Sequence, residues 1–420
     1  MRHLSFAMLM GWALVSGGSL SALAEEQTLL WNQWRGPTRD GIVSGTVWPQ
    51  SLGDDVLTQA WRVELPPSYS GPVVSEKAVF VTGTEDKETE VVYAFDRMTG
   101  EQLWRTEWPG AISVPFFAAS NGSWIRATPA YDGKSLFVAG MRDVLVSLDA
   151  ETGQEKWRVD FVENLETAPP SFGFVSSPLV VGDFVYVQAG ASFVKLNKQT
   201  GEMVWRTLED DGGMMGSAFS SPIRTTLSGQ DQMVVQTRQK LAGVHPESGK
   251  VLWEQVVPSF RGMNILTPVP FGDGIFTSSY QNQSWLYQTS REGESYSVEE
   301  AWTETAKAYM STPVVIDGHA YLHLQNQRFC CIDLSTGERK WTSRTYGKYC
   351  SLIAQGDQIL ALDERGVLLL IKANPDEFEL LDERTISEDE TWAHLAISGS
   401  QLFVRELNAL TAFSWQSASQ

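Results

Sequence analysis

The chain has 420 residues, with 32 Lys and Arg against 51 Asp and Glu, which gives a net charge of −19. So acidic a protein argues against nucleic acid and anionic lipid as partners, because both are bound by clustered Lys and Arg. Three cysteines, Cys330, Cys331 and Cys350, are too few to form a disulfide framework.

Residues 1–24 have the pattern of a cleaved secretory signal peptide. Arg2 precedes an apolar run over residues 4–15, and small residues around Ala22 predict cleavage before Glu25. The run is too short to span a bilayer, and no later stretch is apolar enough, so we expect no stable membrane insertion. No Cys stands at the cleavage point, so we expect no lipid anchor. The prediction is a periplasmic or secreted protein.

Residues 25–57 lie outside the repeats described below. They contain the phrase Trp31-x-x-Trp34-Arg35-Gly36-Pro37-x-Arg39-Asp40-Gly41. We predict that this segment is an ordered cap over one face of the molecule, in which Arg35 and Arg39 can pair with Asp40. Docking of a partner by this segment is the alternative.

One phrase then recurs along the chain and indicates a repeat architecture. Each copy starts with a residue that can bond its own backbone, continues through a Gly suited to a left-handed turn, and ends on a Trp. We expect each Trp to pack between neighbouring repeats. The copies are Asp96-x-x-Thr99-Gly100-Glu101-x-x-Trp104, Asp149-x-x-Thr152-Gly153-Gln154-x-x-Trp157, Asn197-x-x-Thr200-Gly201-Glu202-x-x-Trp205, His245-x-x-Ser248-Gly249-Lys250-x-x-Trp253 and Asp333-x-x-Thr336-Gly337-Glu338-x-x-Trp341.

A second signal gives the number of repeats. Small residues, usually followed by Pro, open a short strand that leads through a turn to an alternating apolar strand. These openings stand at Ser70, Ala127, Ser176, Ser220, Leu266, Ser311, Cys350 and His394. The prediction is therefore an all-β fold, an eight-bladed β-propeller with four-stranded antiparallel blades over residues 58–420. The last unit offers only three obvious strands, so we expect the N-terminal segment Thr58–Val63 to supply its fourth and close the ring.

The adjacent cysteines lie in a strand phrase, Phe329-Cys330-Cys331-Ile332-Asp333. Neighbouring strand residues point to opposite faces, so we favour one thiol in each flanking core. A strained vicinal disulfide, or a bridge from Cys350 to either neighbour, stays open at this point.

Propellers bind ligands at the mouth of the central channel, on loops that lead from the outer strand of one blade to the inner strand of the next. In this chain those loops are rich in aromatic and cationic side chains, which suit a ligand or an extended peptide, and the cations could hold a carboxylate. The alternative is that the aromatics only seal the channel and the cations pair with nearby acids. The candidate binding residues are Tyr69, Trp124, Arg126, Phe174, Phe219, Arg261, Asn264, Tyr309, Lys348, Tyr349 and Trp392.

The repeated phrase, over about residues 58–413, resembles the PQQ-like (pyrroloquinoline-quinone-type) β-propeller repeat family. The segment Trp34–Gly41 is similar to the start of secreted PQQ-like proteins of planctomycete-type bacteria. Two activities share this repeat: quinoprotein alcohol and glucose dehydrogenases, and the non-enzymatic propeller of the outer-membrane β-barrel assembly machinery. The likeness implies the fold strongly and the function weakly.

A quinoprotein dehydrogenase needs an oxygen cage for Ca²⁺, a carboxylate base and a stacking platform for the quinone. The channel loops offer Asn264 and little else for such a cage, and Glu388, Asp389 and Glu390 read as a solvated loop. The vicinal cysteines of those enzymes lie in a loop beside the cofactor, whereas Cys330 and Cys331 lie in a strand. We therefore assign no catalytic or metal-binding residue and expect no cofactor, with PQQ and calcium as the alternative.

The sequence favours an exported, non-enzymatic propeller that serves as a binding or scaffold module. Its partner would be a protein, peptide or envelope component, and the protein itself a monomer. A PQQ- and calcium-dependent dehydrogenase of alcohols or sugars is one alternative, and a carbohydrate-binding propeller is another.

Overall fold

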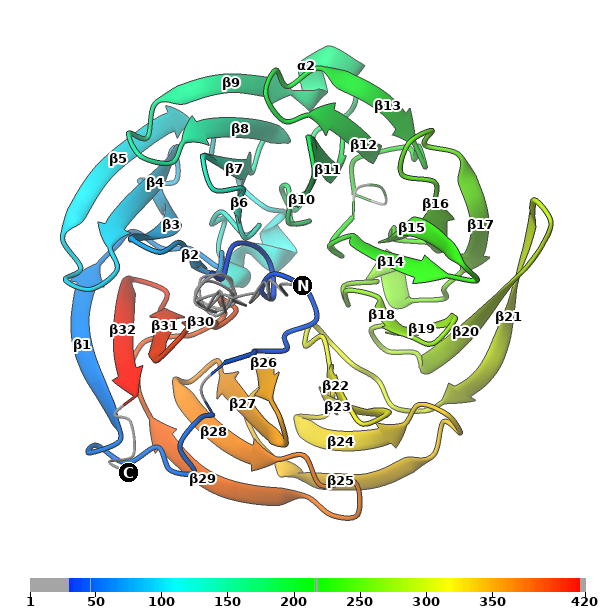
Figure 1. Ribbon diagram of the computed structural model, residues 1–420. Coiled ribbons are helices and arrows are strands. Elements are labelled where there is room, and N and C mark those ends of the chain that lie inside the picture. The colour runs from blue at the N-terminus through cyan, green and yellow to red at the C-terminus, as the bar shows by residue number, and fades with distance from the viewer. Residues whose placement is uncertain (1–29, 46, 215, 217, 416–420) are drawn as a thin grey trace, which may run out of the picture.

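The computed structural model describes residues 30–45, 47–214, 216 and 218–415. The predicted signal peptide lies outside these residues. Eight four-stranded antiparallel sheets stand as blades around a central axis (Figure 1), which confirms the predicted fold and number of blades. No helix in the described part of the chain is long and apolar enough to cross a membrane.

The blades follow one another along the chain, and each runs outward from a short inner strand. Blade 1 comprises β2 (Val73–Val74), β3 (Ala78–Glu85), β4 (Thr89–Asp96) and β5 (Gln102–Pro109), and blade 2 comprises β6 (Ala130–Tyr131), β7 (Ser135–Gly140), β8 (Val144–Asp149) and β9 (Glu155–Asp160). Blade 3 comprises β10 (Leu179–Val181), β11 (Phe184–Ala189), β12 (Ser192–Asn197) and β13 (Met203–Thr207). Blade 4 comprises β14 (Ile223–Leu227), β15 (Gln230–Gln236), β16 (Lys240–Val244) and β17 (Val251–Val256).

Blade 5 comprises β18 (Val269–Phe271), β19 (Gly274–Ser278), β20 (Ser284–Glu292) and β21 (Ser295–Glu304), and blade 6 comprises β22 (Val314–Ile316), β23 (His319–His323), β24 (Arg328–Asp333) and β25 (Arg339–Thr345). Blade 7 comprises β26 (Cys350–Gln355), β27 (Gln358–Asp363), β28 (Val367–Lys372) and β29 (Glu379–Thr385). Blade 8 comprises β30 (Ala396–Ser398), β31 (Gln401–Arg405) and β32 (Ala409–Trp415), together with β1 (Leu57–Glu64) from the other end of the chain. Three short helical segments lie between blades: η2 (Phe116–Asn121), α2 (Phe161–Leu165) and η3 (Phe260–Gly262).

The ring is closed by its two ends. Strand β1 pairs antiparallel with β32, from Leu57 opposite Trp415 to Glu64 opposite Ala409. The predicted closing strand is therefore confirmed, and the outer edge of the eighth blade is covered.

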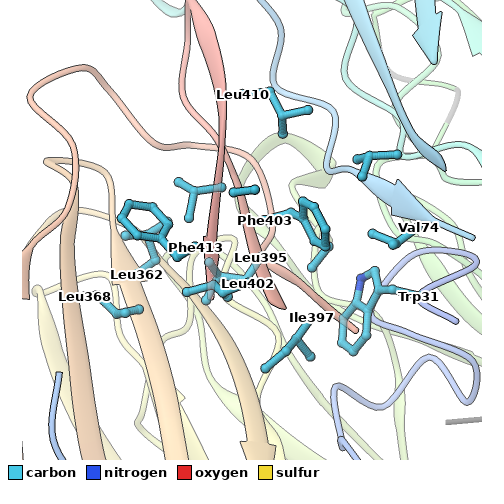
Figure 2. Close-up of a cluster of buried hydrophobic side chains, with 14 of the residues drawn as sticks. Trp31, Val74, Leu362, Leu368, Leu395, Ile397, Leu402, Phe403, Leu410 and Phe413 are labelled. Carbon is cyan, nitrogen blue, oxygen red and sulfur yellow. The ribbon is translucent and has the colours of Figure 1, made fainter. Parts of the chain in front are cut away.

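Burial within a blade follows strand position. The second strand of blade 2, Ser-Leu-Phe-Val-Ala-Gly, is buried along its whole length, whereas the outer strand β9 alternates between exposed and covered side chains. Apolar side chains of adjacent blades interlock between the sheets, and Figure 2 shows this for Leu362 of blade 7, Phe403 of blade 8 and Val74 of blade 1, which belong to one buried cluster. Burial of these faces supplies the hydrophobic stabilisation of the ring.

The recurring Trp joins most blades to the next. Trp104 of blade 1 donates its indole N–H to the Ala150 carbonyl of blade 2 at 3.0 Å, and its ring covers Gly153, whose φ is +73°. A Cβ at Gly153 would lie 2.5 Å from that ring, so the turn requires Gly for two reasons. Equivalent indole-to-carbonyl bonds are made by Trp61, Trp157, Trp205, Trp302 and Trp341.

The adjacent cysteines point into different cores, as expected. Cys330 packs in the cluster between blades 5 and 6, and Cys331 in the cluster between blades 6 and 7. Cys331 shares its cluster with Cys350, and all three are buried free thiols. Burial raises the pKa of each thiol, which favours the protonated form.

The N-terminal segment enters the centre of the ring before it runs past blade 7 to β1 (Figure 1). Trp31 pairs with Val74 of blade 1, and Val43 donates to the Ala354 carbonyl of blade 7. The buried Arg35 donates to the Pro313 carbonyl of blade 6 at 2.6 Å. The buried Arg39 donates to the carbonyls of Ser177 and Pro178 in blade 3. We call residues 31–43 the plug.

The expected pairing of Arg35 and Arg39 with the Asp40 carboxylate is wrong. Arg35 reaches only the backbone oxygen of Asp40, whose side chain accepts from Thr38 and from the Ile42 N–H. The physical reason is that carbonyls at the blade openings face the channel, and the two guanidinium groups satisfy them there.

Two buried carboxyls bridge neighbouring blades in the same way. Glu90 accepts from the Met141 N–H and from the Trp108 indole, and Asp143 accepts from the Gly190 N–H at 2.7 Å. Burial raises the pKa of both Glu90 and Asp143 to about 7. Each therefore binds a proton more tightly in the folded chain than in the unfolded chain.

This predicts a pH-dependent effect of Asp143→Asn. Between about pH 4 and pH 7 the folded state holds the extra proton, so the stability due to protonated Asp143 is present at low pH and is lost as pH rises. Asn keeps an acceptor for Gly190 and tolerates the left-handed φ of 65°. We expect Asp143→Asn to leave the free energy of unfolding unchanged at pH 4 and to raise it by about 2–4 kcal/mol at pH 8, as measured by urea unfolding. An equal effect at both pH values would contradict this, and the exposed Asp357→Asn serves as the control.

Candidate functional site

The floor of the central channel is made by the plug. The Trp34 indole donates to the Thr267 hydroxyl at 3.0 Å, and its ring meets His394 edge-on at 4.9 Å. Burial, together with nearby Arg35, lowers the pKa of His394 to about 3, so this imidazole is neutral. Trp34 therefore closes the channel at the level of the blade openings.

Above this floor is a cavity of about 180 Å³, which we call the central cavity. Its wall is largely aromatic: Tyr349 and Trp392 stack with ring centroids 5.6 Å apart and planes 18° apart, and Tyr69 lies 6.1 Å from Trp392. The lining residues are Trp34, Tyr69, Arg126, Val175, Ser177, Phe219, Ser221, Ile265, Thr267, Tyr309, Met310, Tyr349, Trp392 and His394.

Hydroxyls of the blade openings form the lower part of the cavity. Two of them accept a backbone N–H from the preceding blade: the Ser177 hydroxyl accepts from Thr128 at 3.0 Å, and the Ser221 hydroxyl accepts from Ser177 at 3.0 Å. The small residues that mark the blade openings in the sequence thus also tie adjacent blades together around the channel. Among the described residues, neither Ser177 nor Ser221 donates its own hydroxyl proton to an acceptor.

Arg126 lies in the wall with few partners. Its guanidinium packs over Tyr69, 5.4 Å from the ring centroid, and Nη2 donates to the Gly122 carbonyl at 2.7 Å. Its Nε is buried and, within the described part of the chain, meets no acceptor. Burial lowers the pKa of Arg126, because a charged guanidinium is less stable away from water.

A groove of about 330 Å³ leads from the cavity towards blades 2 to 5, and we call it the rim groove. Arg126, Phe219 and Tyr309 line both spaces, so the two are continuous; together we call them the funnel. The groove adds Phe117, Ala118, Phe172, Met214, Arg238, Phe260, Arg261, Met263 and Tyr280.

The aromatic rings of the groove form a connected surface. Phe172 contacts Phe117 and Phe219, with centroid distances of 6.3 and 5.6 Å, and Tyr280 contacts Tyr309 at 5.1 Å. Arg238 packs 4.6 Å from the Phe219 centroid while donating to backbone carbonyls, including that of Arg261. Edge-to-face ring pairs of this kind hold the surface in one arrangement.

Six of the eleven sequence-predicted site residues line the central cavity: Tyr69, Arg126, Phe219, Tyr309, Tyr349 and Trp392. Arg261 lines the rim groove instead. Trp124 packs against Gly122 and lines neither space, and Lys348 is exposed outside both.

Two predicted residues point into the protein interior. Phe174 is buried against Phe161 in the core between blades 2 and 3. Asn264 is fully buried, and its amide donates to the carbonyls of Arg238 and Val257. Their loops were identified from the sequence, but the direction of each side chain depends on loop geometry that the repeat pattern does not specify.

The sequence reasoning also missed residues that the structure brings to the site. Trp34 comes from the plug, which the sequence placed over a face of the ring and not at the floor of the channel. Ser177, Ser221 and Thr267 come from the openings, where their small size indicates a strand and gives no sign of a site. Arg238 lies at the β15–β16 turn, outside the loops that join one blade to the next.

These features define an eight-bladed propeller with a plugged channel and an aromatic funnel. Residues 17–118 and 87–343 match a PQQ-like family model described as outer membrane protein assembly factor BamB. The chain therefore belongs to the PQQ-like β-propeller family.

A relative named outer membrane protein assembly factor BamB, from Yersinia pestis, is 24% identical over 264 residues, which cover 59% of this chain and 63% of that protein. The crystal structure of BamB from Moraxella catarrhalis matches with a TM-score of 0.63 at 13% identity, covering 87% of this chain and 99% of that one. Quinohemoprotein alcohol dehydrogenase from Comamonas testosteroni matches with a TM-score of 0.67 at 14% identity, covering 95% and 83%. The two structural likenesses show the fold alone.

The donor set does not fit a calcium-bound quinone. No Asp or Glu stands among the lining residues of the central cavity. Within the described residues, no three His, Cys, Asp or Glu side chains gather where they could hold a metal ion. Asn264 is fully buried and lines neither the cavity nor the groove, and the Glu390 carboxylate accepts from the Trp392 indole.

Proposed function

We propose that this protein is an exported, non-enzymatic propeller of the bacterial cell envelope that binds an extended peptide or protein segment in its funnel. The relatives named as outer membrane assembly factors support a role in the envelope. Because the match spans 63% of the Yersinia pestis protein, a role in outer membrane assembly is itself only part of this proposal.

The observation that carries the proposal is the apolar rim. Phe117 is 51% exposed, Met214 47% and Phe260 44%, all within one groove that continues into the central cavity. Contiguous exposed apolar side chains with polar groups among them mark surfaces that bind other molecules. An extended segment can place alternate side chains along such a groove.

Site-specific photo-crosslinking tests the proposal. A photoreactive phenylalanine in place of Phe117 is expected to crosslink a protein in the envelope of the native host. The control is the same substitution at Leu103 on β5, which is also 51% exposed but lies on an outer strand. Absence of crosslinks from both sites, or equal crosslinking from both, would contradict a binding funnel.

A carbohydrate ligand is the second candidate, because the stacked Tyr349 and Trp392 rings give an aromatic platform on which a sugar could pack. Glycan-array screening separates this candidate from peptide binding.

A further inference from the structure

The funnel has a charge opposite to that of the whole protein. The chain has a net charge of −19, yet the charged side chains that line the two spaces are Arg126, Arg238 and Arg261. No Asp or Glu lines either space among the described residues. The charged side chains on the funnel wall are therefore all cationic, which favours an anionic group there over a cationic one.

Arg126 is the cation best placed to bind such a group, because it lies where the central cavity meets the rim groove. A guanidinium has five N–H donors. One bond is made, to the Gly122 carbonyl, and the buried Nε meets no acceptor within the described part of the chain. Arg238 differs, because its nitrogens donate to the carbonyls of Met214, Gly216, Gly262 and Arg261.

Arg126 shares the central cavity with neutral donors. Ser177 and Ser221 line the same cavity, and each hydroxyl oxygen already accepts a backbone N–H. Their protons are therefore the groups left to bond a ligand. One guanidinium with two hydroxyls matches the single negative charge and two oxygens of a carboxylate.

We propose that the funnel recognises a carboxylate on an extended peptide segment: the carboxylate binds Arg126 and the floor hydroxyls, and the adjoining side chains lie on the aromatic rim groove. The inference rests on the proposed function and adds the chemistry that is recognised. The carboxylate can be the C-terminal group of the segment or an Asp or Glu side chain within it, and both present the same two oxygens.

Three matched peptide pools test this on the full-length protein. All three pools contain labelled hexapeptides randomised over aromatic and aliphatic residues. The first pool has a free C-terminal carboxylate, the second has a C-terminal amide, and the third has the amide and one internal Glu. Retention by the protein is measured by mass spectrometry. We expect at least about tenfold stronger retention of a carboxylate pool than of the neutral amide pool, as loss of one charged hydrogen-bonded pair implies. Comparison of the free-acid and Glu pools shows whether the bound carboxylate is a C-terminal group or an acidic side chain.

Variants locate the effect. Arg126→Gln is expected to reduce retention of the preferred pool about ten- to a hundredfold and to leave the amide pool unchanged. Because Arg126 is partly buried, the exposed Arg261→Gln provides a second variant, with an expected loss of a few-fold. Arg344→Gln removes the same charge from the outer strand β25 and is the control.

The outcomes separate the two proposals. Equal retention of all three pools, or retention that Arg126→Gln does not change, would overturn the carboxylate inference while peptide binding stands. Retention of none of the pools would overturn both.

Discussion

Deletion of residues 1–64 is expected to abolish soluble, cooperatively folded protein. The deletion removes β1, and with it the pairing with β32 from Leu57 to Glu64. The backbone of β32 would then be an unpaired edge, and apolar residues of the core between blades 8 and 1, Trp61 among them, would be lost. Expression in the soluble fraction and thermal unfolding measure the result.

A shorter deletion separates the closing strand from the plug. A chain that starts at Val47 lacks Trp31, Arg35 and Arg39 but keeps Leu52 and all of β1. We expect it to remain soluble with a lowered Tm, because the ring is closed but the carbonyls of Ser177, Pro178 and Pro313 lose buried donors. A soluble, cooperative protein from the longer deletion would contradict the role of β1.

Gly153→Ala is expected to destabilise the protein by about 3–5 kcal/mol. The new Cβ would lie 2.5 Å from the Trp104 ring at a backbone position with φ +73°. Either the turn or the indole must then move, and the indole bond to the Ala150 carbonyl is lost. Urea unfolding measures the change in the free energy of unfolding.

Gly182→Ala is the matched control. Gly182 also has a positive φ, of +57°, but nothing lies within 4 Å of a Cβ built there. We expect a loss of about 1–2 kcal/mol, the cost of the left-handed conformation alone. Equal losses for the two variants would show that the contact with Trp104 contributes nothing.

The sequence predicted the fold because the repeat records it directly. The turn phrase at Asp149 to Trp157 specifies both a tight turn and the side chain that reaches the next blade, so counting copies gives the blades. The closing strand followed from a deficit, since the last unit lacked a fourth strand.

The site was only partly predictable for a different physical reason. The repeat identifies which loops reach the channel mouth, but not which way a loop side chain turns. Tyr349 and Trp392 face the cavity, whereas Phe174 and Asn264 turn inward to fill space or satisfy carbonyls. The entry of the plug into the channel could not be predicted, because Arg35 and Arg39 find their acceptors in distant backbone, and no local pattern reveals those partners.

The indole-to-carbonyl hydrogen bonds that join neighbouring blades, which we call the indole locks, do not run all the way round the ring. Trp253 of blade 4 donates to Gln232 of its own blade, and the outer strand of blade 7 has no Trp. The locks therefore run through two arcs, one from blade 8 through blades 1, 2, 3 and 4, and one from blade 5 through blades 6 and 7. Two seams separate the arcs, between blades 4 and 5 and between blades 7 and 8.

Each seam is bridged by a segment that departs from the repeat. The long β20–β21 hairpin packs Tyr296 and Val298 against the core that contains Trp253. At the other seam, Leu52 binds Asp382 of blade 7 through its N–H, just before the chain enters blade 8. The extended hairpin and the N-terminal linker thus join the two arcs at the places where the indole locks are missing, and they complete the ring.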